Sequence, residues 1–116
     1  MFLGPSAPTN IRISQIQSTQ FTVNWDAVSG LTDFRFQIGY GINSWQSSAL
    51  VPISDNQRVI NNLQSNTEYV VKVRLQKLNS NAEIVSNWSP TVRQETGECL
   101  LNHKNILSIY YFVYHC

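Results

Sequence analysis

The residue types best suited to metal ligation and nucleophilic catalysis are confined to the C-terminus of the chain. Cys99, His103, His115 and Cys116 include every cysteine and every histidine of the sequence. Structural zinc needs four such ligands that converge on one point, and a Cys-x3-His followed much later by a His-Cys pair matches no familiar zinc finger. We therefore predict no metal site. A disulfide between Cys99 and Cys116 stays open, because spacing alone cannot decide pairing.

Acid–base catalysis by histidine is excluded for residues 1–98, which contain none. The carboxylates in this region include Asp26, Asp33, Asp55, Glu68, Glu83 and Glu95. They are scattered over strand ends and outer faces, where we interpret them as solvated surface charge. We therefore predict no catalytic residue, no bound cofactor and no small-molecule substrate, so that the chain is not an enzyme.

Length and charge restrict the class of protein further. A chain of 116 residues is one domain by size. The formal net charge of +1 gives no reason to expect nucleic acid or an anionic membrane as a partner. The segment Met1–Pro8 lacks the basic and apolar regions of a signal peptide.

Alternation of apolar and polar residues predicts the elements that would position any site. In residues 20–26, one face of the predicted strand carries Phe21, Val23 and Trp25. In residues 34–40, one face carries the aromatic residues Phe34, Phe36 and Tyr40. Further strands are predicted at 10–14, 49–53, 57–61, 68–77 and 83–96, the last with an interruption at 88–90. With no helical periodicity between residues 9 and 96, seven strands predict an all-β, antiparallel two-layer sandwich.

A long strand after a polar turn organises this sandwich. Tyr69, Val71 and Val73 alternate with polar residues, and Leu63 precedes the turn. This is the pattern of a tyrosine corner, in which the ring packs inside while its hydroxyl bonds to the backbone upstream. Burial of Trp25 is worth at most about 5 kcal/mol at about 25 cal/mol per Å². The predicted core residues are Trp25, Tyr40, Leu63, Tyr69, Val71 and Val73.

These residues resemble a fibronectin type III domain. The matching features are Pro8 before the first strand, Trp25 and Tyr40 at the ends of the second and third strands, Thr67 in the corner with its flanking apolar residues, and a Ser-Pro step before the final strand. The absence of a Cys…Trp…Cys pattern argues against an antibody-type immunoglobulin domain. The resemblance implies a seven-stranded immunoglobulin-like sandwich over residues 8–98, after a linker at 1–7 and before an apolar tail at 99–116.

The resemblance also implies a function. Domains of this family are non-catalytic interaction or spacer modules of cell-surface receptors, adhesion proteins and matrix proteins, and they have neighbouring domains in the same parent protein. Residues 79–83 lack the Arg-Gly-Asp tripeptide of the integrin-binding members, so the protein partner stays unidentified. An intracellular structural module of a filament protein, built on the same fold, is an alternative.

A second alternative is the membrane-proximal domain of a cytokine-type receptor. Val85–Ser89 matches four of the five positions of the Trp-Ser-x-Trp-Ser motif, counting the free one, and lacks its first Trp. By this resemblance Trp88 stacks on Lys72 and Arg74, which face outward on the long strand. A cation over an indole contributes about 0.5–1 kcal/mol at exposed sites. Otherwise Trp88 covers the edge of the sandwich.

Two further surface positions stand out. Asn87 begins an Asn-Trp-Ser sequon, a candidate for N-glycosylation that requires a secretory parent protein and favours an extracellular or cell-surface location. Trp45 lies in a polar loop, where it serves as a contact residue or folds back onto the sheet edge; we favour the second.

The tail at 99–116 differs from the rest of the chain. Its apolar run at 106–114 is about half the length of a membrane span. It is an alternatively spliced or read-through end, an extra packed element, or a weak membrane-associating segment. We favour the first reading, so that the chain is a truncated or alternatively ended piece of a multi-domain parent.

Overall fold

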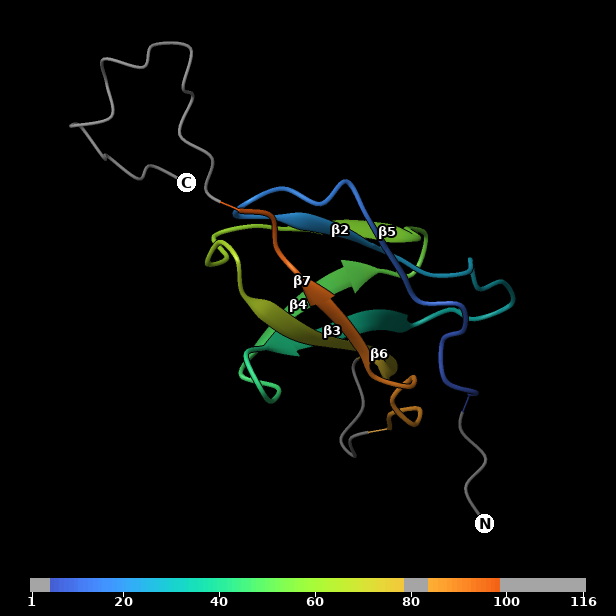
Figure 1. Cartoon of the computed structure of the whole chain (residues 1–116). Helices are drawn as coiled ribbons and strands as arrows, with labels where there is room; N and C mark the ends of the chain where they lie inside the picture. Colours follow the sequence, from blue (N-terminus) through green and yellow to red (C-terminus); the bar gives the residue numbers. More distant parts are fainter. Residues whose placement is uncertain (1–4, 79–83, 99–116) are drawn as a thin grey trace, which may run out of the picture.

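Two antiparallel sheets make up the described part of the chain. The computed structural model describes residues 5–78 and 84–98, which contain seven strands and no helix (Figure 1). The strands are β1 (Arg12–Ser14), β2 (Phe21–Asn24), β3 (Phe34–Gly41), β4 (Ser47–Pro52), β5 (Gln57–Ile60), β6 (Glu68–Lys77) and β7 (Val92–Glu95). One sheet has the order β1-β2-β5 and the other the order β4-β3-β6-β7. The predicted all-β sandwich is confirmed.

The core lies between the sheets and follows the alternation in the sequence. The largest fully buried side chains are Trp25, Phe21 and Phe36, and the ring centroids of Trp25 and Phe36 lie 4.9 Å apart. On β6, Tyr69 is 6% exposed while Val71 and Val73 are fully buried. Tyr40 is only half-buried and packs against the margin of this cluster.

The turn before β6 is closed by hydroxyl groups. The Tyr69 hydroxyl accepts a hydrogen bond from the backbone N–H of Gln64 at 2.8 Å. The buried Thr96 hydroxyl accepts from the Thr67 N–H at 3.0 Å and donates to the Gln64 carbonyl at 2.6 Å. Because Thr96 follows β7 directly, these bonds tie the corner to the end of the last strand.

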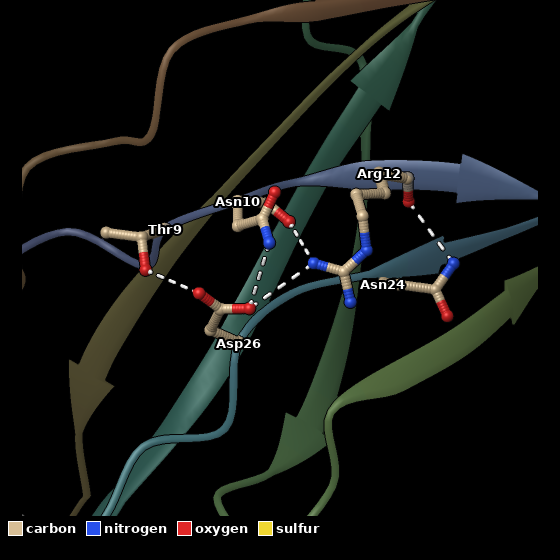
Figure 2. A network of polar contacts seen from close by, with 5 residues as sticks. All are labelled: Thr9, Asn10, Arg12, Asn24 and Asp26. Atoms are coloured by element: carbon tan, nitrogen blue, oxygen red, sulfur yellow. Dashed lines mark hydrogen bonds and ion pairs between the residues drawn. The ribbon is translucent and has the colours of Figure 1, made fainter.

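A polar network around Asp26 attaches the incoming chain to the end of β2 (Figure 2). The Asp26 carboxylate accepts hydrogen bonds from the side chains of Thr9, Asn10 and Arg12, at 3.2 to 3.3 Å. The bond from Asn10 is the main cause that lowers the pKa of Asp26; Arg12 and Thr9 act in the same direction and together they outweigh the opposing effect of desolvation.

The described chain enters and leaves at opposite ends of the sandwich (Figure 1). At one end, the backbone carbonyl of Thr9 accepts a hydrogen bond from the N–H of Asp26, just beyond the end of β2. Gly97 donates its N–H to the carbonyl of Gln17, just before the start of β2.

The C-terminal strand differs from its predicted extent. The sequence predicts a last strand over residues 83–96 with an interruption at 88–90, whereas β7 is confined to Val92–Glu95. Before it, Val85 forms an isolated bridge with Gln76. The predicted hairpin tip at 79–81 lies outside the described residues, as do the tail and its Cys99, His103, His115 and Cys116.

Candidate functional site

Two tryptophans and two cations gather on the outer face of the four-stranded sheet. The Lys72 ammonium and the Arg74 guanidinium each lie 4.4 Å from the centroid of the Trp88 ring. Trp45 extends the group, because its ring lies 5.8 Å from that of Trp88 and 5.9 Å from the Lys72 ammonium. We call these four residues the tryptophan–cation cluster. At exposed sites each cation–ring contact is worth about 0.5–1 kcal/mol.

The long strand β6 aims both cations outward. Successive side chains of a strand point to opposite faces, and Val71, Val73 and Leu75 occupy the core. Lys72 and Arg74 therefore face away from the core, two residues apart on one surface. The Arg74 Nε also donates to Gln37 Oε1 on the neighbouring strand β3 at 2.8 Å, which fixes the guanidinium beside the sheet.

Two buried serines hold the segment that carries Trp88 against β6. Ser86 donates its backbone N–H to the Leu75 carbonyl at 2.9 Å, and its hydroxyl accepts the Leu75 N–H at 2.8 Å. Ser89 repeats both bonds with Val73, at 2.8 and 2.9 Å. The hydroxyls thus accept the N–H groups that carbonyls of a neighbouring strand would accept in a regular sheet. This irregular segment therefore completes the hydrogen bonding along the edge of β6, and it places Trp88 over the outer face.

A tight turn after β3 brings Trp45 back over that strand. Asn43 has a φ of 68°, and the Gln46 N–H donates to the Tyr40 carbonyl at 3.1 Å. A Cβ built on Gly39 would overlap Cδ1 and Nε1 of the Trp45 indole, so the ring rests directly on the glycine backbone. Trp45 therefore lies on the sheet face over a central strand, instead of at the sheet edge, and stays 43% exposed.

A shallow depression of about 260 Å³ adjoins Trp45. Gly39 and Val70 contribute to its lining, together with Trp45, Lys72 and Arg93. Within residues 5–78 and 84–98, no ion pair includes Lys72, whereas Arg93 pairs with Glu68 at 3.2 Å on the exposed surface.

The other predicted site residue, Asn87, is exposed next to Trp88. The hydroxyl of its sequon partner Ser89 is buried and bonded to the Val73 N–H. The resemblance to the Trp-Ser-x-Trp-Ser motif implied the stack of Trp88 on Lys72 and Arg74, and the structure contains it. That resemblance did not indicate the contact with Trp45. The available signal was Gly39, a residue without a side chain in the middle of a strand, which often marks close approach of another group.

The arrangement offers non-covalent contacts. In the part of the chain that the structure describes, no group of three His, Cys, Asp or Glu residues could hold a metal ion. The same residues contain no helix long and apolar enough to cross a membrane. Tryptophan and arginine side chains are enriched where protein surfaces bind protein partners.

Solved structures share this fold. The fibronectin type III domain of the human collagen alpha-1(XX) chain superposes with a TM-score of 0.70 at 18% identity, covering 89% of this chain and 95% of that one. The corresponding domain of human contactin 1 gives a TM-score of 0.67 at 16% identity, with coverage of 87% and 85%. A two-domain segment of chicken tenascin gives 0.62 at 18%, and the match covers 78% of this chain and 49% of that segment.

Sequence comparison gives the family directly. A search of curated proteins found no match. The sequence profile of the fibronectin type III domain, however, matches residues 6–95, which is most of the chain and includes every strand of the two sheets. The chain therefore belongs to the fibronectin type III family.

Proposed function

We propose that this domain is a non-catalytic interaction module of a cell-surface or matrix protein, and that it binds a protein partner through the tryptophan–cation cluster. The observation that carries the proposal is Trp45, which is 43% exposed yet packed on the Gly39 backbone and against Trp88. A ring held in this way loses little conformational freedom on binding. Tryptophan and arginine are also the residue types enriched at interface hot spots.

The relatives and the chain geometry support a place in a larger parent protein. Contactin, tenascin and collagen domains share the fold, and the tenascin segment contains two such domains. Here the chain enters and leaves at opposite ends of the sandwich (Figure 1). That geometry suits a spacer with a neighbour on each side.

We further propose an extracellular location with a glycan on Asn87. Asn87 is exposed, so the fold has room for a sugar there. Secretion of the parent protein from cultured cells, followed by glycosidase treatment, is expected to give a mass shift that Asn87→Gln abolishes. Glycosylation of the secreted protein would also contradict the intracellular filament alternative. No shift would remove the glycan from the proposal.

A second candidate is the membrane-proximal domain of a cytokine-type receptor. It is favoured by Trp88 between Lys72 and Arg74, with Ser86 and Ser89 on either side. Val85 stands where the motif has its first Trp. This candidate requires a cysteine-bearing domain immediately before the present one in the parent protein, which sequencing of the parent transcript would reveal.

Surface binding tests the leading proposal. The full chain, multimerised on fluorescent beads, is expected to bind live cells or the matrix laid down by cultured fibroblasts. Trp45→Ala should weaken that binding at least about tenfold, the effect of losing a hot-spot side chain. Val59→Ala is the control, because Val59 is 45% exposed on the other sheet. Equal binding by both variants, each with an unchanged melting temperature, would contradict the proposal.

A further inference from the structure

We propose that the depression beside Trp45 binds one carboxylate, carried by an aspartate or glutamate side chain of the protein partner, with an apolar neighbour of that residue against the indole. This inference rests on the proposed function, because it names the chemistry of the partner at the same surface.

The sheet itself makes the hollow. Gly39 has no side chain and Val70 has a short one, and both face the outer surface of the sheet. The register places Lys72 directly across from Gly39, and Arg93 directly across from Val70. An apolar floor is thus bordered by a cation on each of two adjoining strands, while Trp45 forms a wall.

The charge of Lys72 at this hollow is not balanced by a carboxylate within the described residues. Lys72 contacts two indole rings, which attract its ammonium without neutralising it. No ion pair within the described residues includes Lys72. Arg93 is paired with Glu68, but both side chains are more than half exposed. Such an exposed ion pair is weak, so the guanidinium can turn toward a ligand in the hollow. A ligand with one negative charge complements this arrangement.

A protein carboxylate suits the surface better than a sulfated polysaccharide does. A polyanion gains affinity from many cations along its path. On this face the other cations are engaged: Arg74 bonds to Gln37 and stacks on Trp88, and Arg35 donates to Gln76 Oε1 at 2.9 Å. A hollow of about 260 Å³ has room for one acidic side chain and part of its neighbour.

Peptide titration monitored by NMR tests this site on the full chain. The probes are the blocked peptide acetyl-Gly-Leu-Glu-Gly-amide, its Gln counterpart and a heparin hexasaccharide. We expect the Glu peptide to shift the indole Nε1–H signal of Trp45 and the backbone amide of Lys72, with an affinity that falls as salt rises. The Gln peptide should cause no comparable shift.

Three variants separate charge from geometry. Lys72→Gln should reduce the affinity for the Glu peptide about tenfold. Lys77→Gln makes the same change on the same strand, at an exposed position outside the lining of the hollow, and should leave the affinity unchanged. Gly39→Ala keeps every charge but displaces the Trp45 indole from the backbone, and it should also lower the affinity for the Glu peptide.

Several results would overturn the inference. These are equal shifts with the Gln peptide, unchanged affinity in Lys72→Gln, and binding of the hexasaccharide without binding of the Glu peptide. If Trp45→Ala loses binding to cells while Lys72→Gln keeps it, the proposed carboxylate site is wrong, but the proposed function as an interaction module is supported. If neither variant changes binding to cells but the Glu peptide still binds at Lys72, the proposed function fails instead.

Discussion

At the scale of single residues, side-chain hydroxyls accept hydrogen bonds from backbone N–H groups that have no partner on a neighbouring strand. Ser86 and Ser89 accept N–H groups of β6, Thr96 closes the turn before it, and Tyr69 accepts the N–H of Gln64. Buried N–H groups without a partner cost free energy, so these small polar residues are structural.

Tyr69→Phe tests one of these bonds. The variant keeps the buried ring but leaves the Gln64 N–H without its acceptor. We expect the free energy of unfolding to fall by about 0.5–1.5 kcal/mol, measured by urea denaturation. Tyr40→Phe is the control, because the Tyr40 hydroxyl makes no hydrogen bond within the described residues. An equal effect of the two substitutions would show that the corner bond contributes nothing.

Asp26 gives the domain a pH dependence of defined sign. Hydrogen bonds in the folded state, that from Asn10 foremost, lower the pKa of Asp26. A depressed carboxyl pKa contributes stability above the unfolded value of about 3.9, and this is lost as pH falls through the folded pKa. Asp26→Asn should therefore lose less unfolding free energy than the parent chain between about pH 6 and pH 3. Identical pH profiles would contradict this role of the carboxylate.

At the scale of elements, the sequence was most informative where the alternation was longest. Residues 68–77 coincide with β6, and the alternation around Trp25 and Phe36 correctly marked the buried faces of β2 and β3. The C-terminal strand was less predictable. The segment before β7 bonds to β6 through the hydroxyls of Ser86 and Ser89, and such bonds leave no periodic pattern in the sequence.

The tryptophan–cation cluster could be predicted only in part, for a related reason. Parity along one strand places Lys72 and Arg74 on the outer face, and this follows from the sequence. The position of Trp45 depends instead on the register that sets Gly39 against Lys72, and on the turn that reverses the chain after β3. Register between strands distant in sequence is a property of the folded sheet.

One strand pair contains a built-in repulsion. Glu68 on β6 lies directly across from Glu95 on β7, and like charges opposite each other are destabilising. Glu95→Lys should raise the free energy of unfolding by about 0.2–1 kcal/mol, with Glu95→Gln intermediate. Urea denaturation at low and high salt measures both. The gain should shrink at high salt, and a gain that does not respond to salt would point to a cause other than charge.

At the scale of the whole molecule, the described residues contain one continuous hydrophobic core. The buried hydrophobic cluster runs from Phe21 to Leu75, and partly buried neighbours such as Ile11 border it. We accordingly expect a chain ending at Glu98 to keep the melting temperature of the full chain within about 2 °C, since less than about 0.5 kcal/mol is at stake. Calorimetry of both chains measures this. A clear drop would show that residues 99–116 pack on the domain.

The placement of Thr9 and Gly97 at opposite ends of the sandwich has a mechanical consequence. Tension between flanking domains would pull β1 from the Thr9 end and β7 from the Gly97 end, each along its own axis. Every hydrogen bond between β1 and β2, and between β7 and β6, would then be strained together instead of one after another. A strand pair sheared in this way resists extension better than one that is peeled apart. In a parent protein with a domain on each side, as proposed above, this geometry would keep the sandwich closed under tension.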